Sequence, residues 1–524
     1  MTSNKFRAVL LGCAAVALLG ACTGADGVAS PGVGAFVPPP APPPAPPAPP
    51  PPGPPAPPTG GPAADCPAGF ANVGTISNRR ICQLPQTITG ALVVPEREGT
   101  IYSVSGQTRV GIDLGPDATS PLPGGAQGIL TIEPGVTIFG SAGLDYLLVN
   151  RGSLIFAEGT PEKPIIMTSR QSVAGTTNEN SIGQWGGLVI NGRAPTRDGC
   201  PAGVTSLPNI ACEAQVEGSN AFYGGISPAD NSGRIQYLRV MYSGFEIAPN
   251  NELNGITLAG VGHGTTFEYV QVHNSSDDGI EIFGGNVNLK YIVITGSDDD
   301  QFDTDSGWRG AAQFGIAYQR TAGGDYGFET SNRPSTTTNN LLATRPVYAN
   351  WTIVQRTTLT AAGQRRAGIV HNTGHVGQVF NSVVTANNGV QCLQVANADT
   401  LNNPNNFGGN GPVFRSVFMS CDGGAVLGSG GVTNAQVDSI LDVAGSNNVK
   451  AGTSTLINGF INGANENAVP ATNILALPQS ASPNALPASI ASYLTPVDYI
   501  GAVRDANDTW YQGWTCGLPT TPAC

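Results

Sequence analysis

Short runs of apolar and β-branched residues recur along most of the chain, and each run ends in a cluster of Gly, Asn, Asp or Ser. Residues 129–138 are typical, and shorter runs follow at 147–149, 154–156 and 165–167. Such runs between turn residues predict strands, and no segment of useful length has the period of about 3.6 residues that marks an amphipathic helix. The pattern predicts an all-β protein.

A repeat emerges when the segments that contain tyrosine are aligned. Residues 235–238, 267–270 and 289–292 match, and the last two lie 22 residues apart. Residues 379–383 and 413–417 match at an interval of 34, which corresponds to one coil plus an insertion. Periods of this size are typical of solenoids, and a repeat without a helix predicts a right-handed parallel β-helix with coils about 4.8 Å apart. A β-propeller is the alternative, but it needs four strands in each repeat of about 40 to 50 residues.

The start of the chain predicts export and attachment to a membrane. Lys5 and Arg7 precede an uncharged run at 8–21, which is too short to span a bilayer and ends in small residues. The order Leu-Gly-Ala-Cys, which ends at Cys22, resembles the bacterial lipobox, and this resemblance implies that Cys22 becomes a lipid-modified, palmitate-bearing N-terminus. Position 23 is Thr and not the Asp that retains enteric lipoproteins in the inner membrane, so we expect an outer-membrane protein exposed at the cell surface.

Proline dominates the segment that follows. Most residues between Pro38 and Pro58 are proline, and all the remaining ones are Ala or Gly. The segment therefore has few backbone donors and cannot form a helix or a sheet. We expect a disordered tether in the polyproline II conformation, which at about 3.1 Å per residue spans roughly 65 Å. A proline-rich ligand for a recognition domain is the alternative, but no charged residue interrupts the run.

These features divide the chain into five parts. They are a lipoprotein signal peptide at 1–21, a lipid-anchored linker at 22–61, a cysteine-containing N-terminal cap at 62–100, a parallel β-helix at 101–495 and a C-terminal cap at 496–524. If either end of the solenoid is only partly covered, its unpaired backbone groups would bind another copy head to tail, which gives open filaments. Full capping, which gives a monomer, is the alternative.

The charge of the chain argues against one class of partner, and its cysteine content predicts disulfides. The chain has 24 Lys and Arg against 36 Asp and Glu, a formal net charge of −12, which argues against nucleic acid as a partner. Beyond the anchor, an even number of cysteines in an exported chain predicts disulfides. Sequence proximity favours the pairs Cys66 with Cys82, Cys200 with Cys212, Cys392 with Cys421, and Cys516 with Cys524. Zinc is the alternative, but the chain has no Cys-x-x-Cys pair.

The candidate metal ligands are the acidic residues between 277 and 305. They are Asp277, Asp278, Glu281, Asp298, Asp299, Asp300, Asp303 and Asp305, and they face one lysine, Lys290. The two acidic turns are one coil apart, so they would stack on one edge of a β-helix, where carboxylates repel one another unless they are solvated or neutralised. Ca²⁺, which takes several oxygen ligands, is the natural ion for such a site. A solvated acidic corner in which carboxylates accept from turn amides is the alternative.

An enzyme that cleaves polysaccharide is an alternative function. β-helix lyases combine calcium with a basic side chain, and the candidates for that base are Lys290, Arg309 and Arg320. His263 lies in a Gly-His-Gly motif similar to one of the pectin hydrolases, but the paired aspartates follow it here instead of preceding it. His371 and His375 have the spacing of a metalloprotease motif, but the glutamate base is missing and the intervening Gly would break a helix. The sequence therefore favours a protein that is not an enzyme.

Several motifs of this chain resemble those of a known family. They are residues 184–192, 277–285, 298–303, 307–310 and 499–502, together with Trp510 and Trp514. These motifs resemble those of bacterial outer-membrane surface lipoproteins with a right-handed parallel β-helix body. The resemblance implies a structural or matrix role with end-to-end association, so we expect a cell-surface structural or adhesive lipoprotein that forms fibres or a biofilm matrix. The alternative is a β-helix protein that binds or cleaves surface polysaccharide.

Overall fold

The computed structural model describes residues 60–204, 207–248, 251–332, 343–356, 367–402, 412–477 and 488–524. All of these residues belong to one compact unit, Pro50–Cys524. The predicted signal peptide, the lipidation site Cys22 and nearly all of the proline-rich linker lie outside the described residues, so these features stay predictions.

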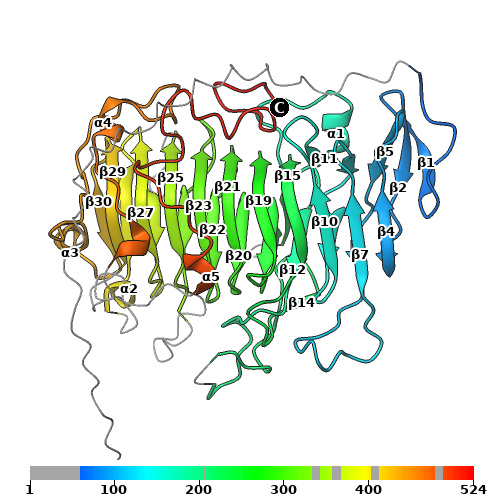
Figure 1. Ribbon diagram of the computed structural model, residues 1–524, viewed down its shortest axis with the longest axis horizontal. Coiled ribbons are helices and arrows are strands. Elements are labelled where there is room, and N and C mark those ends of the chain that lie inside the picture. The colour runs from blue at the N-terminus through cyan, green and yellow to red at the C-terminus, as the bar shows by residue number, and fades with distance from the viewer. Residues whose placement is uncertain are drawn as a thin grey trace, which may run out of the picture. The chain divides into compact units, whose positions relative to one another are not determined.

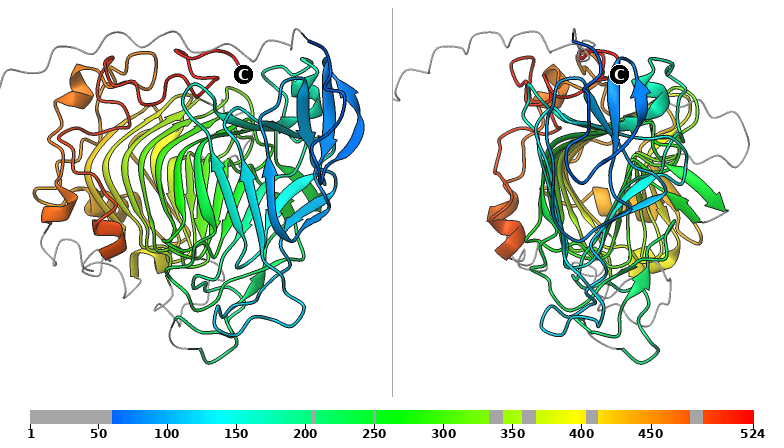
Figure 2. Two further views of the ribbon diagram at one scale, coloured as in Figure 1. Left: turned by 45° about the vertical axis from the view of Figure 1, so that its right-hand side comes forward. Right: turned by 90° about the vertical axis from the view of Figure 1, so that its right-hand side faces the viewer.

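The described chain is wound into a parallel β-helix that is built from two long sheets (Figures 1 and 2). Sheet A contains, in spatial order, β1 (Ala71–Ile76), β2 (Arg79–Gln83), β5 (Thr100–Ser103), β8 (Thr137–Gly140), β11 (Ile165–Ser169), β15 (Gly233–Met241), β19 (Thr266–His273), β21 (Asn288–Thr295), β23 (Ala311–Tyr318), β25 (Val347–Gln355), β27 (Gln378–Ala386) and β29 (Val413–Cys421). A second row of this sheet, β4 (Gly90–Val94), β7 (Gly128–Ile132) and β10 (Leu154–Glu158), joins it at β15. Sheet B contains β3 (Thr87–Ile88), β6 (Gln107–Val110), β9 (Tyr146–Val149), β12 (Gly187–Asn191), β18 (Ile256–Ala259), β20 (Ile280–Phe283), β22 (Phe302–Asp305), β24 (Phe328–Thr330), β26 (Ala367–His371), β28 (Gln391–Ala396) and β30 (Val426–Ser429).

The remaining elements are short. Two antiparallel pairs are formed by β13 (Ala214–Gln215) with β14 (Phe222–Tyr223) and by β16 (Phe245–Ala248) with β17 (Asn251–Leu253). The helices are α1 (Arg170–Val173), α2 (Ala398–Asn402), α3 (Asn434–Leu441), α4 (Ala464–Asn467), the 3₁₀ helix η2 (Ile474–Ala476) and α5 (Ala488–Ala491). Within the described ranges, none of these helices has the length and apolar character needed to cross a membrane.

The path of the chain confirms the predicted all-β fold. Apart from the antiparallel hairpin β1–β2, the strand pairs of the two long sheets are parallel. The chain passes from sheet A to sheet B and back in every coil, as in the succession β19, β20, β21. Crossovers between parallel strands are right-handed as a rule, in keeping with the predicted hand.

One residue in each of the later coils of sheet A has a left-handed backbone, and these residues coincide in register. They are Tyr237, Tyr269, Tyr291, Phe314, Asn350, Asn381 and Ser416, with φ between 48° and 61°. This conformation is costly for aromatic residues, and ring stacking offsets part of the cost. The ring centroid of Tyr269 lies 4.5 Å from that of Tyr237 and 4.4 Å from that of Tyr291. The tyrosine repeat of the sequence therefore marks one bend per coil.

The strand register confirms one of the two alignments made from the sequence. The tyrosine segments pair as predicted. The alignment at an interval of 34 residues is wrong by one residue, since Val379 pairs with Phe414. The bend residues Asn381 and Ser416 coincide instead, at an interval of 35 (416 − 381). A slip of one residue would exchange the inward-facing and outward-facing side chains, so the bend and the core fix the register together.

The two ends of the β-helix are covered differently. At the N-terminal end, β2, β3 and β4 already form a coil, so the β-helix begins within the predicted cap at 62–100, and the segment up to the hairpin strand β1 precedes it. At the C-terminal end, α3 packs against β29 and β30 and buries Val437, Ile440 and Leu441 in the main core. The amphipathic helix α3 therefore covers the last coil.

The C-terminal arm, residues 455–477 and 488–524, lies along the outer face of sheet A (Figures 1 and 2). Reciprocal hydrogen bonds fasten the arm to sheet A at two places: Thr472 exchanges two with Asn381, and Cys516 exchanges two with Gln271. The predicted cap at 496–524 is therefore wrong, because this segment covers a lateral face and not an end. The reason is an apolar stripe on sheet A that needs cover: Val293, Ile316 and Val354 cluster with Phe460, Ile461, Ala502, Val503, Tyr511, Trp514 and Leu518 of the arm.

All four disulfides that sequence proximity favoured are present. They are Cys66–Cys82, Cys200–Cys212, Cys392–Cys421 and Cys516–Cys524. Cys82 lies in β2 and Cys392 in β28, so two of the bridges fasten a strand of the β-helix to a flanking turn or neighbouring strand.

Candidate metal centre

The acidic residues singled out in the sequence come from two successive coils and meet at one corner of sheet B. Asp277 and Asp278 lie in the turn before β20, and Asp299 lies in the turn before β22. Glu281 on β20 pairs in register with Asp303 on β22. Side chains alternate along a strand, so these two face outward while their apolar neighbours face the core.

Five of the predicted ligands form two overlapping carboxylate triads. Oxygen atoms of Asp277, Asp278 and Asp299 lie within 4.8 Å of one another, and so do oxygen atoms of Asp278, Glu281 and Asp303. Asp278 belongs to both triads. The second triad is the more buried, with Asp278 6%, Glu281 7% and Asp303 7% exposed. An all-oxygen set of this kind suits a hard cation.

Hydrogen bonds account for part of this acidic corner. Asp278 accepts from the backbone N–H of Asp300 at 3.0 Å, and Asp300 accepts from the backbone N–H of Tyr326 at 2.5 Å. Each carboxylate thus binds the turn of the following coil. This arrangement supports the alternative of turn-capping carboxylates for these two residues, whereas Glu281 accepts from the side-chain amide of Asn254 at 2.6 Å.

Burial and mutual repulsion raise the pKa values of these carboxyl groups. Burial is the largest cause for Asp277, whose pKa rises to about 8, and repulsion by Asp299 follows. Burial also raises the pKa of Asp278, with further repulsion from Asp277 and Glu281. The pKa of Glu281 rises through burial and through repulsion by Asp303. The corner therefore favours either protonation or a bound cation at neutral pH.

The other predicted ligands lie outside the triads. Asp298 forms an ion pair with Arg320 at 3.3 Å. Asp300 binds the turn described above, and Asp305 accepts from the backbone N–H of Ser306 at 2.6 Å, at the far end of β22. The sequence analysis assigned these residues to the correct coils. It did not predict that Asp305, at the far end of β22, lies away from the triads.

The structure adds residues that the sequence analysis missed. Glu217 and Glu252 belong to an insertion between β12 and β18, and their charges raise the pKa of Asp277. Glu329 on β24 pairs in register with Asp303. A signal for Glu329 existed, because Glu281, Asp303 and Glu329 occupy the same register position and each follows an aromatic or aliphatic residue. Nothing local marks the two insertion residues.

The candidate bases are engaged away from the triads. Lys290 lies on sheet A, not beside the acidic corner as expected, and its ammonium group donates to the carbonyl of Tyr493 at 2.6 Å and to Thr495 at 3.1 Å. The reason is the alternation of sheets within a coil, which sends β21 to the arm-covered face. Arg309 donates to the carbonyl of Ala343 at 3.2 Å.

The histidines of the metalloprotease-like spacing do not lie on a helix. His371 ends strand β26 and His375 lies in the following turn, and both are fully buried. Their Nδ1 atoms are 2.9 Å apart. The backbone N–H of His263 donates to the carbonyl of Pro228 at 3.0 Å in a turn, as expected for a turn residue.

Comparison with known proteins identifies the body of the chain. A family model described as a pectate-lyase-like β-helix domain matches residues 119–465. No curated protein and no solved structure matches the chain significantly. The matched range contains both acidic turns and most of the coils described above. The chain therefore belongs to the family of pectate-lyase-like β-helix domain proteins.

Proposed function

We propose that this chain is a lipid-anchored protein of the outer cell surface whose β-helix is a Ca²⁺-stabilised structural or adhesive element. The overlapping triads around Asp278 carry the proposal, because burial and mutual repulsion make several carboxylates unfavourable together at neutral pH without a cation. Ca²⁺ accepts six to eight oxygen ligands in flexible geometry, so it fits a site assembled from two turns and two strands. The anchor rests on the sequence around Cys22 alone.

A second candidate function is binding or cleavage of an acidic polysaccharide. The match to the pectate-lyase-like domain favours it, and a cation at an outward-facing corner could bridge protein carboxylates to those of a uronate chain. We favour the structural role because Lys290 and Arg320, which could act as bases, bind the C-terminal arm and Asp298 instead. A purely structural protein leaves the polymer intact and does not bind it, a binding protein binds it without cutting it, and an enzyme cuts it.

The test of the structural proposal is an assay with Ca²⁺ and polygalacturonate. We expect the protein to bind Ca²⁺ but not the polymer, and to leave the polymer intact, with neither an unsaturated product in the ultraviolet spectrum nor new reducing ends. Glu281→Gln should weaken Ca²⁺ binding by about tenfold in calorimetry, because it removes one charged ligand, whereas Asp438→Asn on α3 should not. Release of unsaturated product or of new reducing ends would establish the enzyme function instead, and binding of the intact polymer would establish a polysaccharide-binding function.

Self-association would supply the adhesive role, and the two ends differ in their capacity for it. Within the described chain, β1 pairs only with β2, and β4 pairs only with β7, so each keeps one open edge at the N-terminal end. At the other end, α3 covers the last coil. Open strand edges pair with further strands. We therefore propose contacts between N-terminal edges, which give closed dimers, in preference to the head-to-tail fibre suggested by the sequence.

Two matched substitutions separate these assemblies. Val73 on β1 is 47% exposed, and Val443 next to α3 at the opposite end is 46% exposed. Val73→Lys should weaken self-association by at least about tenfold in analytical ultracentrifugation, because a charged edge strand resists pairing, and Val443→Lys should leave it unchanged. Filaments in negative-stain electron microscopy that both substitutions abolish would establish head-to-tail assembly. A wild-type protein that stays monomeric at high concentration would remove self-association from the account.

A further inference from the structure

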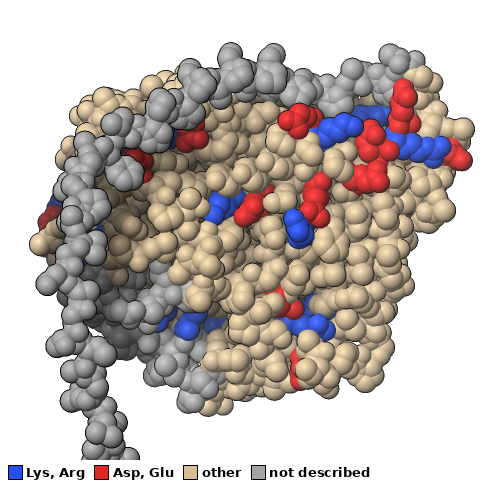
Figure 3. Space-filling model, viewed as in Figure 1, with Lys and Arg blue, Asp and Glu red and all other residues tan. Residues whose placement is uncertain are grey.

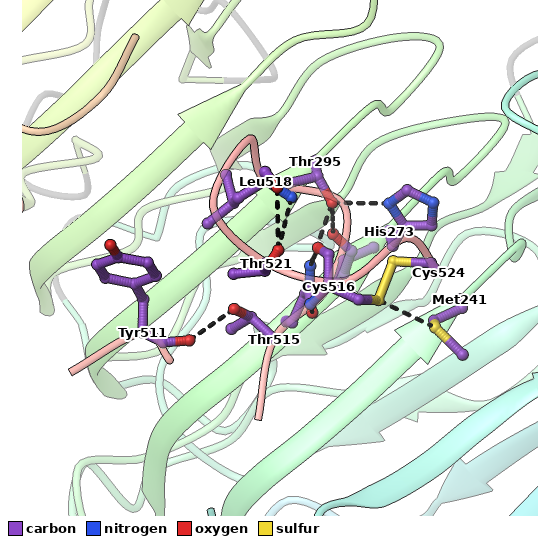
Figure 4. Close-up of a disulfide and its surroundings, with 11 residues drawn as sticks. Met241, His273, Thr295, Tyr511, Thr515, Cys516, Leu518, Thr521 and Cys524 are labelled. Carbon is purple, nitrogen blue, oxygen red and sulfur yellow. Dashed lines mark hydrogen bonds between the residues drawn. A yellow bond between two sulfur atoms is a disulfide. The ribbon is translucent and has the colours of Figure 1, made fainter. Parts of the chain in front are cut away.

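A pocket of about 320 Å³ lies where the C-terminal arm reaches the first coils. Five parts of the chain line it: the β1–β2 hairpin, the start of β8, the segment around β11 and α1, strand β15, and the C-terminal segment from Gly513 to Cys524, which contains the disulfide Cys516–Cys524. Figure 4 shows this disulfide packed beside Met241 and His273. The pocket is on the side of sheet A, so it is separate from the carboxylate triads of sheet B.

Two arginines line this pocket without a partner. The Nε atoms of Arg79 and Arg239 are buried and donate to no acceptor. Across the described residues, neither guanidinium group forms an ion pair or a hydrogen bond. The buried Arg151 shows the usual arrangement, since it pairs with Asp113 at 2.6 Å and Glu213 at 2.7 Å.

The positive charge in the pocket is not neutralised by its surroundings. Burial lowers the pKa of Arg239 to about 10, and burial also lowers the pKa of Arg79. Arginine side chains stay protonated in proteins, so both groups are cations at neutral pH. His273 next to Arg239 is neutral, because burial and the charges of Arg239 and Arg320 lower its pKa to about 3. Buried charges in proteins are normally paired. Arg79 and Arg239 are only partly buried, but their Nε–H groups are buried without an acceptor beside the same cavity, and an anion from outside the chain would supply one.

The size and lining of the pocket indicate what kind of anion fits. A single water occupies about 30 Å³ of liquid, so the cavity is far larger than a simple ion needs and reaches the lower range of small-molecule sites. Hydroxyl groups of Ser172, Thr168 and Thr515 line it, and the buried hydroxyl of Thr168 has no hydrogen-bond partner. Guanidinium groups bind planar or tetrahedral oxyanions through two parallel hydrogen bonds.

We propose that this pocket binds the carboxylate group of an acidic sugar unit, with Arg79 and Arg239 holding the oxyanion and the hydroxyl side chains holding the sugar. The face seen in Figure 3 carries charged residues of both signs and no continuous basic patch, so recognition is local to the pocket. The proposal goes beyond the structural function, and it needs neither Ca²⁺ nor self-association. It gives the surface protein a defined contact with an acidic glycan.

The test is a calorimetric titration of the protein with glucuronate, glucose and inorganic sulfate as probes. We expect glucuronate to bind, glucose not to bind, and sulfate to bind more weakly than glucuronate. Arg239→Met should weaken glucuronate binding by at least about tenfold, because it removes the charged fork. Arg234→Met is the matched control, since Arg234 lies on the same strand but is exposed and pairs with Glu158.

Thermal unfolding without ligand gives an independent readout. A structural arginine would lower the melting temperature when replaced, whereas an unpaired buried charge kept for binding costs stability. Arg239→Met should therefore melt at the same or a higher temperature than the wild type while losing the ligand. Three results would overturn the proposal: no glucuronate binding, sulfate that binds as tightly as glucuronate, or an Arg239→Met variant that melts lower and still binds.

Discussion

Without a divalent cation, the protein is expected to lose thermal stability as the pH rises from about 5 to about 8. The carboxyl groups of Asp277, Asp278 and Glu281 have raised pKa values in the folded state, so between the ordinary value of about 4 and the raised value of about 8 for Asp277 the folded state holds more protons than the unfolded state. The free energy of unfolding then falls with increasing pH across this window. A carboxylate in a salt bridge has the opposite effect, because its lowered pKa makes the free energy of unfolding rise with increasing pH.

Calcium is expected to reverse this loss, and most strongly at the alkaline end of the window. A bound cation replaces the protons, and at a hundredfold excess over its dissociation constant it adds about 2.7 kcal/mol to the free energy of unfolding. Differential scanning calorimetry at about pH 5 and about pH 8, with either EDTA or Ca²⁺, measures both effects. Because protons compete with the cation, the shift in melting temperature caused by Ca²⁺ should be larger at pH 8 than at pH 5.

The double variant Glu281→Gln, Asp303→Asn tests whether the triads cause this behaviour. It keeps the shape of the side chains but removes two of the charges, so its pH dependence in EDTA should flatten and its response to Ca²⁺ should shrink. Asp438→Asn, which changes an exposed carboxylate on α3, should behave like the wild type. A wild-type melting temperature in EDTA that increases toward pH 8 would contradict the account.

The sequence predicts features that repeat with the coil. The bend of sheet A recurs at the tyrosines, and the stacking of the acidic turns follows from their spacing of one coil. The fold and the members of the triad Asp277, Asp278 and Asp299 could therefore be predicted from the sequence pattern alone. Local loops also made the disulfide pairs predictable. Where the coil length changed by an insertion, the alignment slipped by one residue at Ser416.

Contacts across the outside of the β-helix could not be predicted in this way. Lys290 and the acidic corner are neighbours in sequence but lie on different sheets, because each coil visits both faces. The C-terminal arm returns over coils formed more than two hundred residues earlier, as the contact of Cys516 with Gln271 shows (a separation of 245 residues). The pocket arginines, Arg79 and Arg239, are also joined only by this packing. No periodicity in the sequence records such contacts.

Trp514→Ala is expected to release the end of the C-terminal arm from sheet A. The indole of Trp514 is fully buried, meets the rings of Tyr237 and Tyr269 edge-on at 6.0 Å, and donates a hydrogen bond to the carbonyl of Trp510 at 2.8 Å. Replacing a buried Trp with Ala costs about 3 to 5 kcal/mol. Hydrogen exchange should therefore accelerate in the arm beyond residue 500 and on the covered part of β15 and β19, and limited proteolysis should cut the arm.

We expect the release of the arm to leave the coils folded, because the interior of the β-helix has its own hydrophobic core. Residues facing the interior, such as Leu238 and Val270, belong to the main core cluster, whereas Trp514 belongs to the separate cluster between sheet A and the arm. Far-ultraviolet circular dichroism should therefore keep the β-helix signal in Trp514→Ala, while Tyr237 and Tyr269, which Trp514 covers in the wild type, become accessible to solvent. Trp514→Phe, which keeps a ring but loses the hydrogen bond, should cost about 1 to 2 kcal/mol and leave the arm bound. If the β-helix signal collapsed together with the arm, the arm would be part of one cooperative unit with the coils, and the two clusters could not be treated as separate.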